Sequence, residues 1–285
     1  MSDPGRFDHY APEWCPGCGN FDILDCLKEA LCDLEMTARD FIMTVGIGQA
    51  SKLGFSVKCN MFDGLHGRAL PVALGMSMAN HEAKLIAVSG DGCFYAEGGN
   101  HFLHNARRNL NVTVLAGDNR VYGLTKGQAS PTSGAGFTTT VHPEGVGAAP
   151  FNPILTALAS GATFVARGFT GNQAELRQLI GEALRHRGFA LLNILSPCVS
   201  FNKVNSFSWF KQRARPIGPE HDPADLPAAM SLAALGEEAL PTGIFYRTSK
   251  PVFGSHLTAL RGKPIAERTR EFTPERVRPL FDRYR

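Results

Sequence analysis

The chain has 285 residues, of which 44% are hydrophobic and 19% are charged, and this composition excludes an intrinsically disordered protein and a membrane bundle. It contains no apolar run of about 18 residues and starts without the basic and then apolar pattern of a signal peptide, so we expect a cytoplasmic protein that does not bind membranes. The net charge of +3 is unevenly spread, because residues 247–285 carry ten Lys or Arg against four Asp or Glu.

Helical and extended patterns alternate through the first 120 residues. Apolar residues after Asn20 recur every three or four positions, as on one face of a helix, and Phe41–Val45 is a short apolar run typical of a buried strand. Continued along the chain, the pattern predicts helices over residues 20–34, 69–79 and 99–108 and strands over 41–45, 84–88 and 111–116. Strands that alternate with helices indicate an α/β domain with a mostly parallel sheet flanked by helices.

The second half of the chain is less regular. Residues 127–150 are rich in Gly, Thr, Ser and Pro and are typical of a long functional loop. Beyond them the pattern predicts helices over 153–160 and 173–186 and strands over 163–166 and 189–195. From about residue 203 it weakens, and there we expect a helix over 222–240 and otherwise an irregular C-terminal arm. The sequence therefore predicts an α/β domain over residues 1–202 and a C-terminal extension and arm over 203–285.

Four segments that end predicted strands contain residues able to bind a ligand, and in open α/β sheets ligands bind along that edge. The segments lie at Gly46, Gly90, Gly117 and Cys198. Asp91, the Asn119 amide and the backbone carbonyl of Val121 offer the oxygen ligands that Mg²⁺ prefers, and the neighbouring glycines would let a phosphate approach the backbone. The alternative is that these are two ordinary Gly/Asp turns.

The chain has seven cysteines, which in a cytosolic protein are expected to be metal ligands or buried thiols rather than disulfides. Cys15 and Cys18 form a Cys-x-x-Cys pair on a Gly/Pro loop. Such a pair could hold two corners of an iron–sulfur or zinc site, act as a thioredoxin-like redox pair, or bind nothing. Cys26 and Cys32 fall in the first predicted helix, where we expect buried thiols.

Taken in order, these segments resemble the β subunit of 2-oxoacid:ferredoxin oxidoreductases over residues 10 to about 247. The motifs that carry the resemblance are WCPGCGN (14–20), GIG (46–48), LHGRA (65–69), GDG (90–92), GGNH (98–101), RRN (107–109), DNRVYGLTKGQASPT (118–132), FVARG (164–168), SPC (196–198) and GIFY (243–246). The resemblance implies a thiamine diphosphate-binding fold of the diphosphate type over residues 1–202, with the Cys-x-x-Cys segment at its start.

The resemblance also implies a site for thiamine diphosphate and Mg²⁺. Asp91, Asn119 and the Val121 carbonyl would hold Mg²⁺. His66 would lie beside the cofactor as a candidate catalytic residue, against the alternative of a core or helix-capping histidine. The other residues that the resemblance places near the cofactor are Ile47, Gly48, Gly90, Gly92, Cys93, Gly123, Leu124 and Thr125. In this family the glutamate that activates the aminopyrimidine comes from the partner chain, so we do not expect it here.

The family further implies a [4Fe–4S] cluster held by four cysteines. Cys15, Cys18 and Cys198 match three of them, but Gln49 stands where the family has a cysteine after the GIG turn. Three thiolates could hold a cluster whose fourth iron has a weaker ligand, Cys59 could take the fourth position, or the cluster could be lost or altered. We favour retention of the cluster, because three of the four positions remain.

The implied reaction interconverts a 2-oxoacid and coenzyme A with acyl-CoA and CO₂, and passes low-potential electrons to ferredoxin. The enzyme would be active only with an α subunit, as an α2β2 heterotetramer. Lys126 follows the cofactor segment, and its ammonium could pair with the distal carboxylate of 2-oxoglutarate, which we favour as the substrate. The alternative for Lys126 is a solvated loop lysine.

Two other functions stay open from the sequence. A non-redox thiamine diphosphate-dependent decarboxylase or synthase subunit would not need the Cys-x-x-Cys segment or the cysteine after the last strand. A small iron–sulfur electron carrier would not need the Asp91 and Asn119 segments.

The positive excess of residues 247–285 also has two interpretations. A basic tail is typical of nucleic-acid binding, but this one is interrupted by prolines and has no reading motif. We therefore expect no nucleic-acid binding and a contact with an acidic partner subunit.

Overall fold

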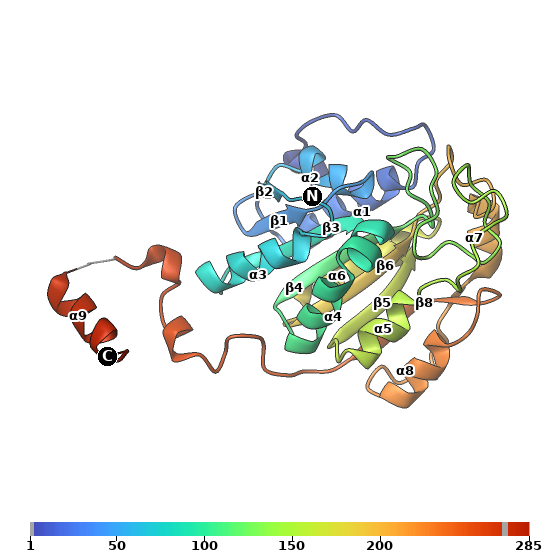
Figure 1. The fold of residues 1–285 in the computed structure, drawn as a ribbon. Helices are drawn as coiled ribbons and strands as arrows, with labels where there is room; N and C mark the ends of the chain where they lie inside the picture. Colours follow the sequence, from blue (N-terminus) through green and yellow to red (C-terminus); the bar gives the residue numbers. More distant parts are fainter. Residues whose placement is uncertain (1–2, 270–272, 285) are drawn as a thin grey trace.

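The computed structural model describes residues 3–269 and 273–284, and within them eight strands form one sheet in the order β2-β1-β3-β4-β6-β5-β8-β7 (Figure 1). The strands are β1 (Phe41–Val45), β2 (Asn60–Asp63), β3 (Lys84–Gly90), β4 (Val112–Asp118), β5 (Phe164–Phe169), β6 (Phe189–Leu195), β7 (Ala214–Pro216) and β8 (Leu240–Arg247). Every neighbouring pair is parallel except β5 and β8. The predicted α/β fold with a mostly parallel sheet is confirmed.

Helices connect the strands and cover both faces of the sheet. They are α1 (Asn20–Asp33), α2 (Leu53–Ser56), α3 (Ala69–Ala79), α4 (Gly99–Arg108), α5 (Pro153–Ala159), α6 (Gln173–Arg185), α7 (Phe207–Arg213), α8 (Leu226–Ala233) and α9 (Pro274–Asp282). The five helices predicted before residue 187 are confirmed, and Asn152 and Asn172 cap two of them with their side-chain oxygens. Within the described ranges none of these helices has the length and apolar character needed to cross a membrane.

The sheet separates two hydrophobic cores, because successive side chains of a strand point to opposite faces. Along β3, Leu85 and Ala87 pack with α3, α4, α5 and α8, whereas Ile86 and Val88 pack with α1 and α6. Both faces are therefore apolar, which explains why the central strands are continuous hydrophobic runs in the sequence.

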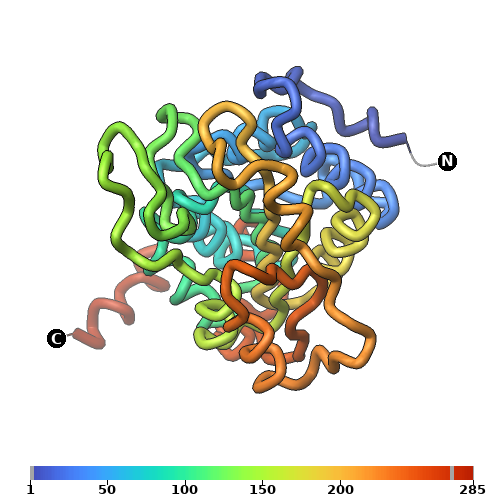
Figure 2. The backbone as a smooth tube through the Cα atoms, turned by 90° about the vertical axis from the view of Figure 1, so that its right-hand side faces the viewer, coloured from blue at the N-terminus to red at the C-terminus, as the bar shows by residue number. Residues whose placement is uncertain are grey.

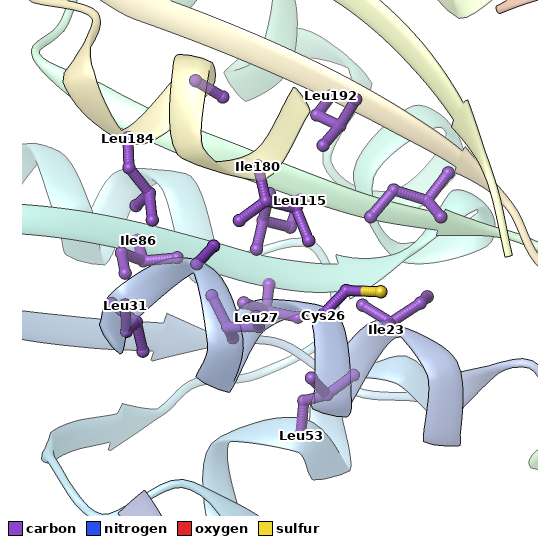
Figure 3. Close-up of a cluster of buried hydrophobic side chains, with 14 of the residues drawn as sticks. Ile23, Cys26, Leu27, Leu31, Leu53, Ile86, Leu115, Ile180, Leu184 and Leu192 are labelled. Atoms are coloured by element: carbon purple, nitrogen blue, oxygen red, sulfur yellow. The ribbon is translucent and has the colours of Figure 1, made fainter. Parts of the chain in front are cut away.

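The core under α1 and α6 contains the first of the predicted buried thiols (Figure 3). Cys26 points from α1 into this core among leucine and isoleucine side chains. Burial raises the pKa of the Cys26 thiol to about 12. Cys26 and Cys32 are both buried, so the expectation for this pair is confirmed.

The sequence missed β2, β7 and β8. β8 lies where an irregular arm was expected, and it pairs with β5 in antiparallel register. Pro241 and Gly243 interrupt its apolar pattern, which hid the strand, since both residues are depleted in strand interiors. The helix expected over 222–240 forms only over Leu226–Ala233. Between β8 and α9 the described residues are irregular apart from two short 3₁₀ turns, and α9 lies away from the domain in Figure 1.

The loops at the carboxyl ends of the parallel strands gather on one side of the molecule. Figure 2 faces this side, with the green segment after β4 beside the orange segment after β6. The Asn202 side chain donates a hydrogen bond of 3.1 Å to the Asn119 carbonyl and so joins these two segments. The topology thus brings together loops that are about 80 residues apart in the chain.

Candidate functional site

A cleft of about 460 Å³ opens where β1, β3 and β4 end. It is lined by all twelve residues that the resemblance assigned to the cofactor, namely Ile47, Gly48, His66, Gly90, Asp91, Gly92, Cys93, Asn119, Val121, Gly123, Leu124 and Thr125. The structure therefore brings the predicted set together in one place.

Asp91 is the buried carboxylate of this cleft, with 2% of its surface exposed. Its Oδ2 accepts hydrogen bonds from the hydroxyls of Ser130 and Thr132, both at 2.6 Å. These hydroxyls come from the long loop after β4, which folds back over the end of β3. The loop that the sequence marked as functional thus fixes the orientation of the Asp91 carboxylate.

A second buried carboxylate, Asp118, lies behind Asp91. The Thr132 hydroxyl is 2.8 Å from Asp118 Oδ1, and Asn193 donates to Asp118 Oδ2 at 3.1 Å. A hydroxyl has one proton, so Thr132 cannot donate fully to both carboxylates. Burial and the nearby charge of Asp118 raise the pKa of Asp91. A cation at Asp91 would relieve this unfavourable pairing of buried carboxylates, so the residues present fit a divalent metal ion.

The Asn119 side chain lies at the end of β4 in a tight local turn. Its Oδ1 accepts a hydrogen bond of 3.0 Å from the Val121 N–H, an Asx-type turn, and Arg120 adopts a left-handed conformation with φ of 57°. The turn holds the Asn119 amide and the Val121 backbone on the wall of the cleft. An amide oxygen has a second lone pair, so Asn119 Oδ1 retains capacity for a metal ion.

Gly92 leaves room for an aromatic side chain at the cleft wall. A Cβ atom at this position would lie 2.2 Å from Tyr122 Cε1, so no other residue fits without moving the ring. Tyr122 also interacts with Glu97 on the cleft rim, and burial together with the charge and hydrogen bond of Glu97 raises the pKa of the Tyr122 hydroxyl. Both residues belong to the lining of the cleft.

The remaining predicted residues occupy different depths. His66 is exposed at the mouth of the cleft, which does not support a core role. Cys93 is buried and accepts a hydrogen bond of 3.2 Å from the Gly67 N–H. Lys126 is exposed just beyond the lining, with φ of 74° and its N–H donating to the Gly123 carbonyl at 3.3 Å. Its side chain starts one residue after Thr125, which does line the cleft.

A second cavity, of about 380 Å³, adjoins the cleft and contains the predicted cluster ligands. Its lining includes Cys15, Cys18 and Cys198 together with Gln49. The thiols of Cys198 and Cys15 add to burial in raising the pKa of Cys18, which places the three sulfurs within electrostatic reach of one another. Gln49, Asn119 and Gly123 line both the cleft and this cysteine cavity, so the two are direct neighbours.

Two close approaches bring the Cys-x-x-Cys segment to the loop after β6. A Cβ atom on Gly19 would lie 2.5 Å from Ser196 Oγ, so only glycine allows the segments to meet. The Gly19 N–H donates to the Pro197 carbonyl at 3.5 Å. The Trp14 indole N–H donates to the Gln49 carbonyl at 2.9 Å and ties the same segment to the turn after β1.

The cysteine cavity contains three thiols but, among the described residues, no compact set of metal ligands. Within residues 3–269 and 273–284, no three His, Cys, Asp or Glu side chains are close enough to hold one ion. Three thiols that line one cavity do offer the kind of ligand that iron–sulfur clusters take. Cys59 does not line it; the Cys59 thiol lies against the Met43 backbone in the α1 core, where burial raises its pKa to about 11.

Sequence reasoning missed several residues of the site. Gln49, Ala50, Glu97 and Tyr122 also line the cleft, and Ser130 and Thr132 hold Asp91. Tyr122, Ser130 and Thr132 all belong to the quoted motif DNRVYGLTKGQASPT, which was a usable signal. The path by which this loop returns to β3 could not be read from the motif itself.

The fold and the cleft define a thiamine pyrophosphate enzyme domain. Residues 46–194, half of the chain, match the family described as thiamine pyrophosphate enzyme, C-terminal TPP binding domain. Residues 198–262 match a second family, described as the C-terminal part of the pyruvate ferredoxin oxidoreductase beta subunit. The second match includes α7, β7, α8 and β8, the elements that the sequence pattern resolved least.

Individual relatives show which kind of thiamine pyrophosphate enzyme the chain resembles. The 2-oxoacid:ferredoxin oxidoreductase 2, subunit beta, of Aeropyrum pernix is 40% identical over 82% of this chain and 79% of its own length. The 2-oxoglutarate synthase subunit KorB of Methanocaldococcus jannaschii is 34% identical over 69% of this chain and 73% of its own. The chain belongs to the family of 2-oxoacid:ferredoxin oxidoreductase β subunits, as the motifs indicated, and is thus a subunit of an oxidoreductase.

A solved structure agrees with this assignment. The 2-oxoglutarate:ferredoxin oxidoreductase from Magnetococcus marinus, determined with 2-oxoglutarate, coenzyme A and succinyl-CoA bound, contains a chain that superposes with a TM-score of 0.86. The two chains are 39% identical, and the match covers 88% of this chain and 87% of the other.

Proposed function

We propose that the chain is the cofactor-binding β subunit of a CoA-acylating 2-oxoacid:ferredoxin oxidoreductase, which works in the cytoplasm with an α subunit as an α2β2 heterotetramer. When bound, thiamine diphosphate supplies the electron sink for cleavage of the bond between the carboxylate and the carbonyl carbon of a 2-oxoacid. In the oxidative direction, 2-oxoacid and CoA yield acyl-CoA, CO₂, one proton and two electrons, and the electrons reduce two ferredoxins.

The observation that carries this proposal is the convergence of all twelve predicted residues on one cleft next to the cysteine cavity. Asp91, Asn119 and the Val121 carbonyl would hold Mg²⁺, and the ion would bind the diphosphate. Ser130 and Thr132 keep the Asp91 carboxylate aligned. His66, an exposed residue of the cleft lining, would hold or move a proton during the reaction.

The cysteine cavity supports a redox enzyme rather than a simple decarboxylase. Cys15, Cys18 and Cys198 would hold an iron–sulfur cluster. Because Gln49, Asn119 and Gly123 form the wall shared by the cleft and the cavity, electrons leaving the cleft would have a short route to the cluster. A non-redox decarboxylase would have no use for this arrangement.

We propose 2-oxoglutarate as the substrate. Relatives named 2-oxoglutarate synthase and the 2-oxoglutarate-bound neighbour support this choice. Within this chain, Lys126 is exposed and follows Thr125 of the cleft lining, and its ammonium would pair with the distal carboxylate of the substrate.

We further propose that residues 1–202 carry the cofactor sites and that 203–285 form an extension whose basic end docks on the α subunit. The extension completes the sheet edge through β8, and β7 pairs with β8. Its final helix, α9, contacts neither core and has no buried side chain among its described residues, as expected of a segment that packs on another chain.

The test is co-expression of the chain with its α subunit, followed by anaerobic purification of the complex. We expect reduction of a viologen dye that depends on thiamine diphosphate, Mg²⁺, CoA and 2-oxoglutarate together. Decarboxylation that proceeds at full rate without an electron acceptor would instead identify a non-redox thiamine enzyme. Iron and acid-labile sulfide analysis of the same sample tests the cluster independently of turnover.

A further inference from the structure

Gln49 has an unusual environment in the wall between the cleft and the cysteine cavity. Its side-chain Oε1 is buried and has no hydrogen-bond partner among the residues that the structure describes. A buried acceptor without a partner costs about 1–3 kcal/mol, so such atoms are rare unless another group meets them. The amide therefore requires an explanation, and Gln49 belongs to the lining of the cysteine cavity.

The Gln49 side chain lies near the Cys198 thiol. The Trp14 indole fixes the Gln49 carbonyl at 2.9 Å, on the turn that leaves β1. A Cβ atom added to Gly123 would lie 3.6 Å from Cys198 Sγ and 3.8 Å from Gln49 Cγ. Gln49 and Cys198 thus flank Gly123, and both line the cavity that contains Cys15 and Cys18.

We propose that Gln49 occupies the fourth corner of the cluster site, so that a four-iron cluster on this chain has one exchangeable iron. This inference rests on the proposed function, because it assumes that the cavity holds an iron–sulfur cluster. Three irons are held by the thiolates of Cys15, Cys18 and Cys198. The fourth faces an amide oxygen, a harder and weaker ligand for iron than a thiolate.

Cys59 is excluded from this corner by its position. It lies before β2 on the far side of β1, packs against the α1 core and does not line the cavity. Gln49 is therefore the residue that decides whether the fourth iron stays. Mild one-electron oxidation would convert [4Fe–4S]²⁺ into [3Fe–4S]⁺, with release of one Fe²⁺ and transfer of one electron to the oxidant.

The experiment compares the wild-type chain, Gln49→Cys and Cys59→Ser, each purified anaerobically in complex with the α subunit. Samples are reconstituted with iron and sulfide, treated with one equivalent of ferricyanide and examined by EPR and iron analysis. In the wild type and Cys59→Ser we expect the signal of a three-iron cluster and loss of about one of four irons. Gln49→Cys should show neither change, because a fourth thiolate then holds the iron.

A second measurement does not depend on the Gln49→Cys variant being stable. The reduced wild-type complex is incubated with ⁵⁷Fe²⁺ and studied by Mössbauer spectroscopy, and we expect labelling of about one iron site in four. The proposal is overturned if the wild type keeps all its iron on oxidation, if Cys59→Ser alone changes the outcome, or if the reconstituted protein holds no cluster. These results concern iron alone, whereas failure of thiamine-dependent dye reduction would count against the proposed function.

Discussion

The cofactor cleft and the cysteine cavity share a wall, yet they are built in different ways. In the cleft the key groups are fixed by their own neighbours: the Asp91 carboxylate by two hydroxyls, and the Asn119 amide by the Val121 N–H. In the cavity the thiols come from two loops that are at least 180 residues apart and meet through glycine packing and one long backbone hydrogen bond.

This difference indicates which amino-acid substitutions should disturb each site. The cleft depends on a buried charge and on the space beside it, so single substitutions there should alter ligand binding while the fold persists. The cavity depends on how two loops approach each other, and one of its corners is an amide instead of a thiol.

The largest effect is expected from Asp91→Asn. The substitution removes the carboxylate from the expected Mg²⁺ ligands, so the affinity for thiamine diphosphate in the presence of Mg²⁺ should fall at least ~100-fold, as measured by calorimetry. The unfolding temperature without cofactor should not fall, because burial and Asp118 already disfavour the charged form of Asp91. If Asp91 had only a structural role, the substitution would instead lower the unfolding temperature and leave the affinity for thiamine diphosphate unchanged.

Asp63→Asn is the matched control for this prediction. Asp63 ends β2, beside β1 on the same sheet edge, but it does not line the cleft. Its substitution should leave cofactor affinity within a factor of two of the wild type. The assignment of Asp91 fails if the two variants bind the cofactor equally well.

A smaller effect is expected from Gly92→Ala. The new methyl group would lie 2.2 Å from the Tyr122 ring, and overpacking of this kind lowers the free energy of unfolding by about 1–3 kcal/mol. In a Tyr122→Ala background the same substitution should cost far less, because the clash is gone. Denaturant unfolding of the four proteins measures the coupling.

Gly99→Ala provides the glycine control. An added Cβ at Gly99, in the first turn of α4, meets no atom within 4 Å, so this substitution should be neutral or slightly stabilising. Equal costs of Gly92→Ala with and without Tyr122 would show that the ring is not what excludes a side chain there.

Much of the fold was predictable because its central strands are buried on both faces. Runs such as Phe41–Val45 and Phe189–Leu195 leave little choice between alternatives. β8 was missed because Pro241 and Gly243 break its pattern, and its place beside β5 depends on tertiary packing. β2 was missed because it is a four-residue edge strand with no fully buried side chain.

The site was predictable for a different reason. Periodicity placed Asp91 and Asn119 at strand ends, but the remaining cleft residues followed from the motifs, and the structure brings them together. The hydroxyls of Ser130 and Thr132 could not be assigned, because their role depends on a loop that returns some 40 residues later to a neighbouring strand. Local sequence carries no information about such a return.

The smallest effect is expected from Lys126→Ala. The exposed ammonium can contribute one charge-assisted contact, so kcat/KM for 2-oxoglutarate should fall ~5- to 10-fold and that for pyruvate should stay within a factor of two. Lys203→Ala, which removes an exposed lysine from the loop after β6, should change neither value. An equal loss on both substrates would mean that Lys126 supports the cofactor segment and does not select the substrate. Selectivity for the substrate would then reside in the α subunit, and the cleft and the cysteine cavity of this chain would differ only in the cofactors that they bind.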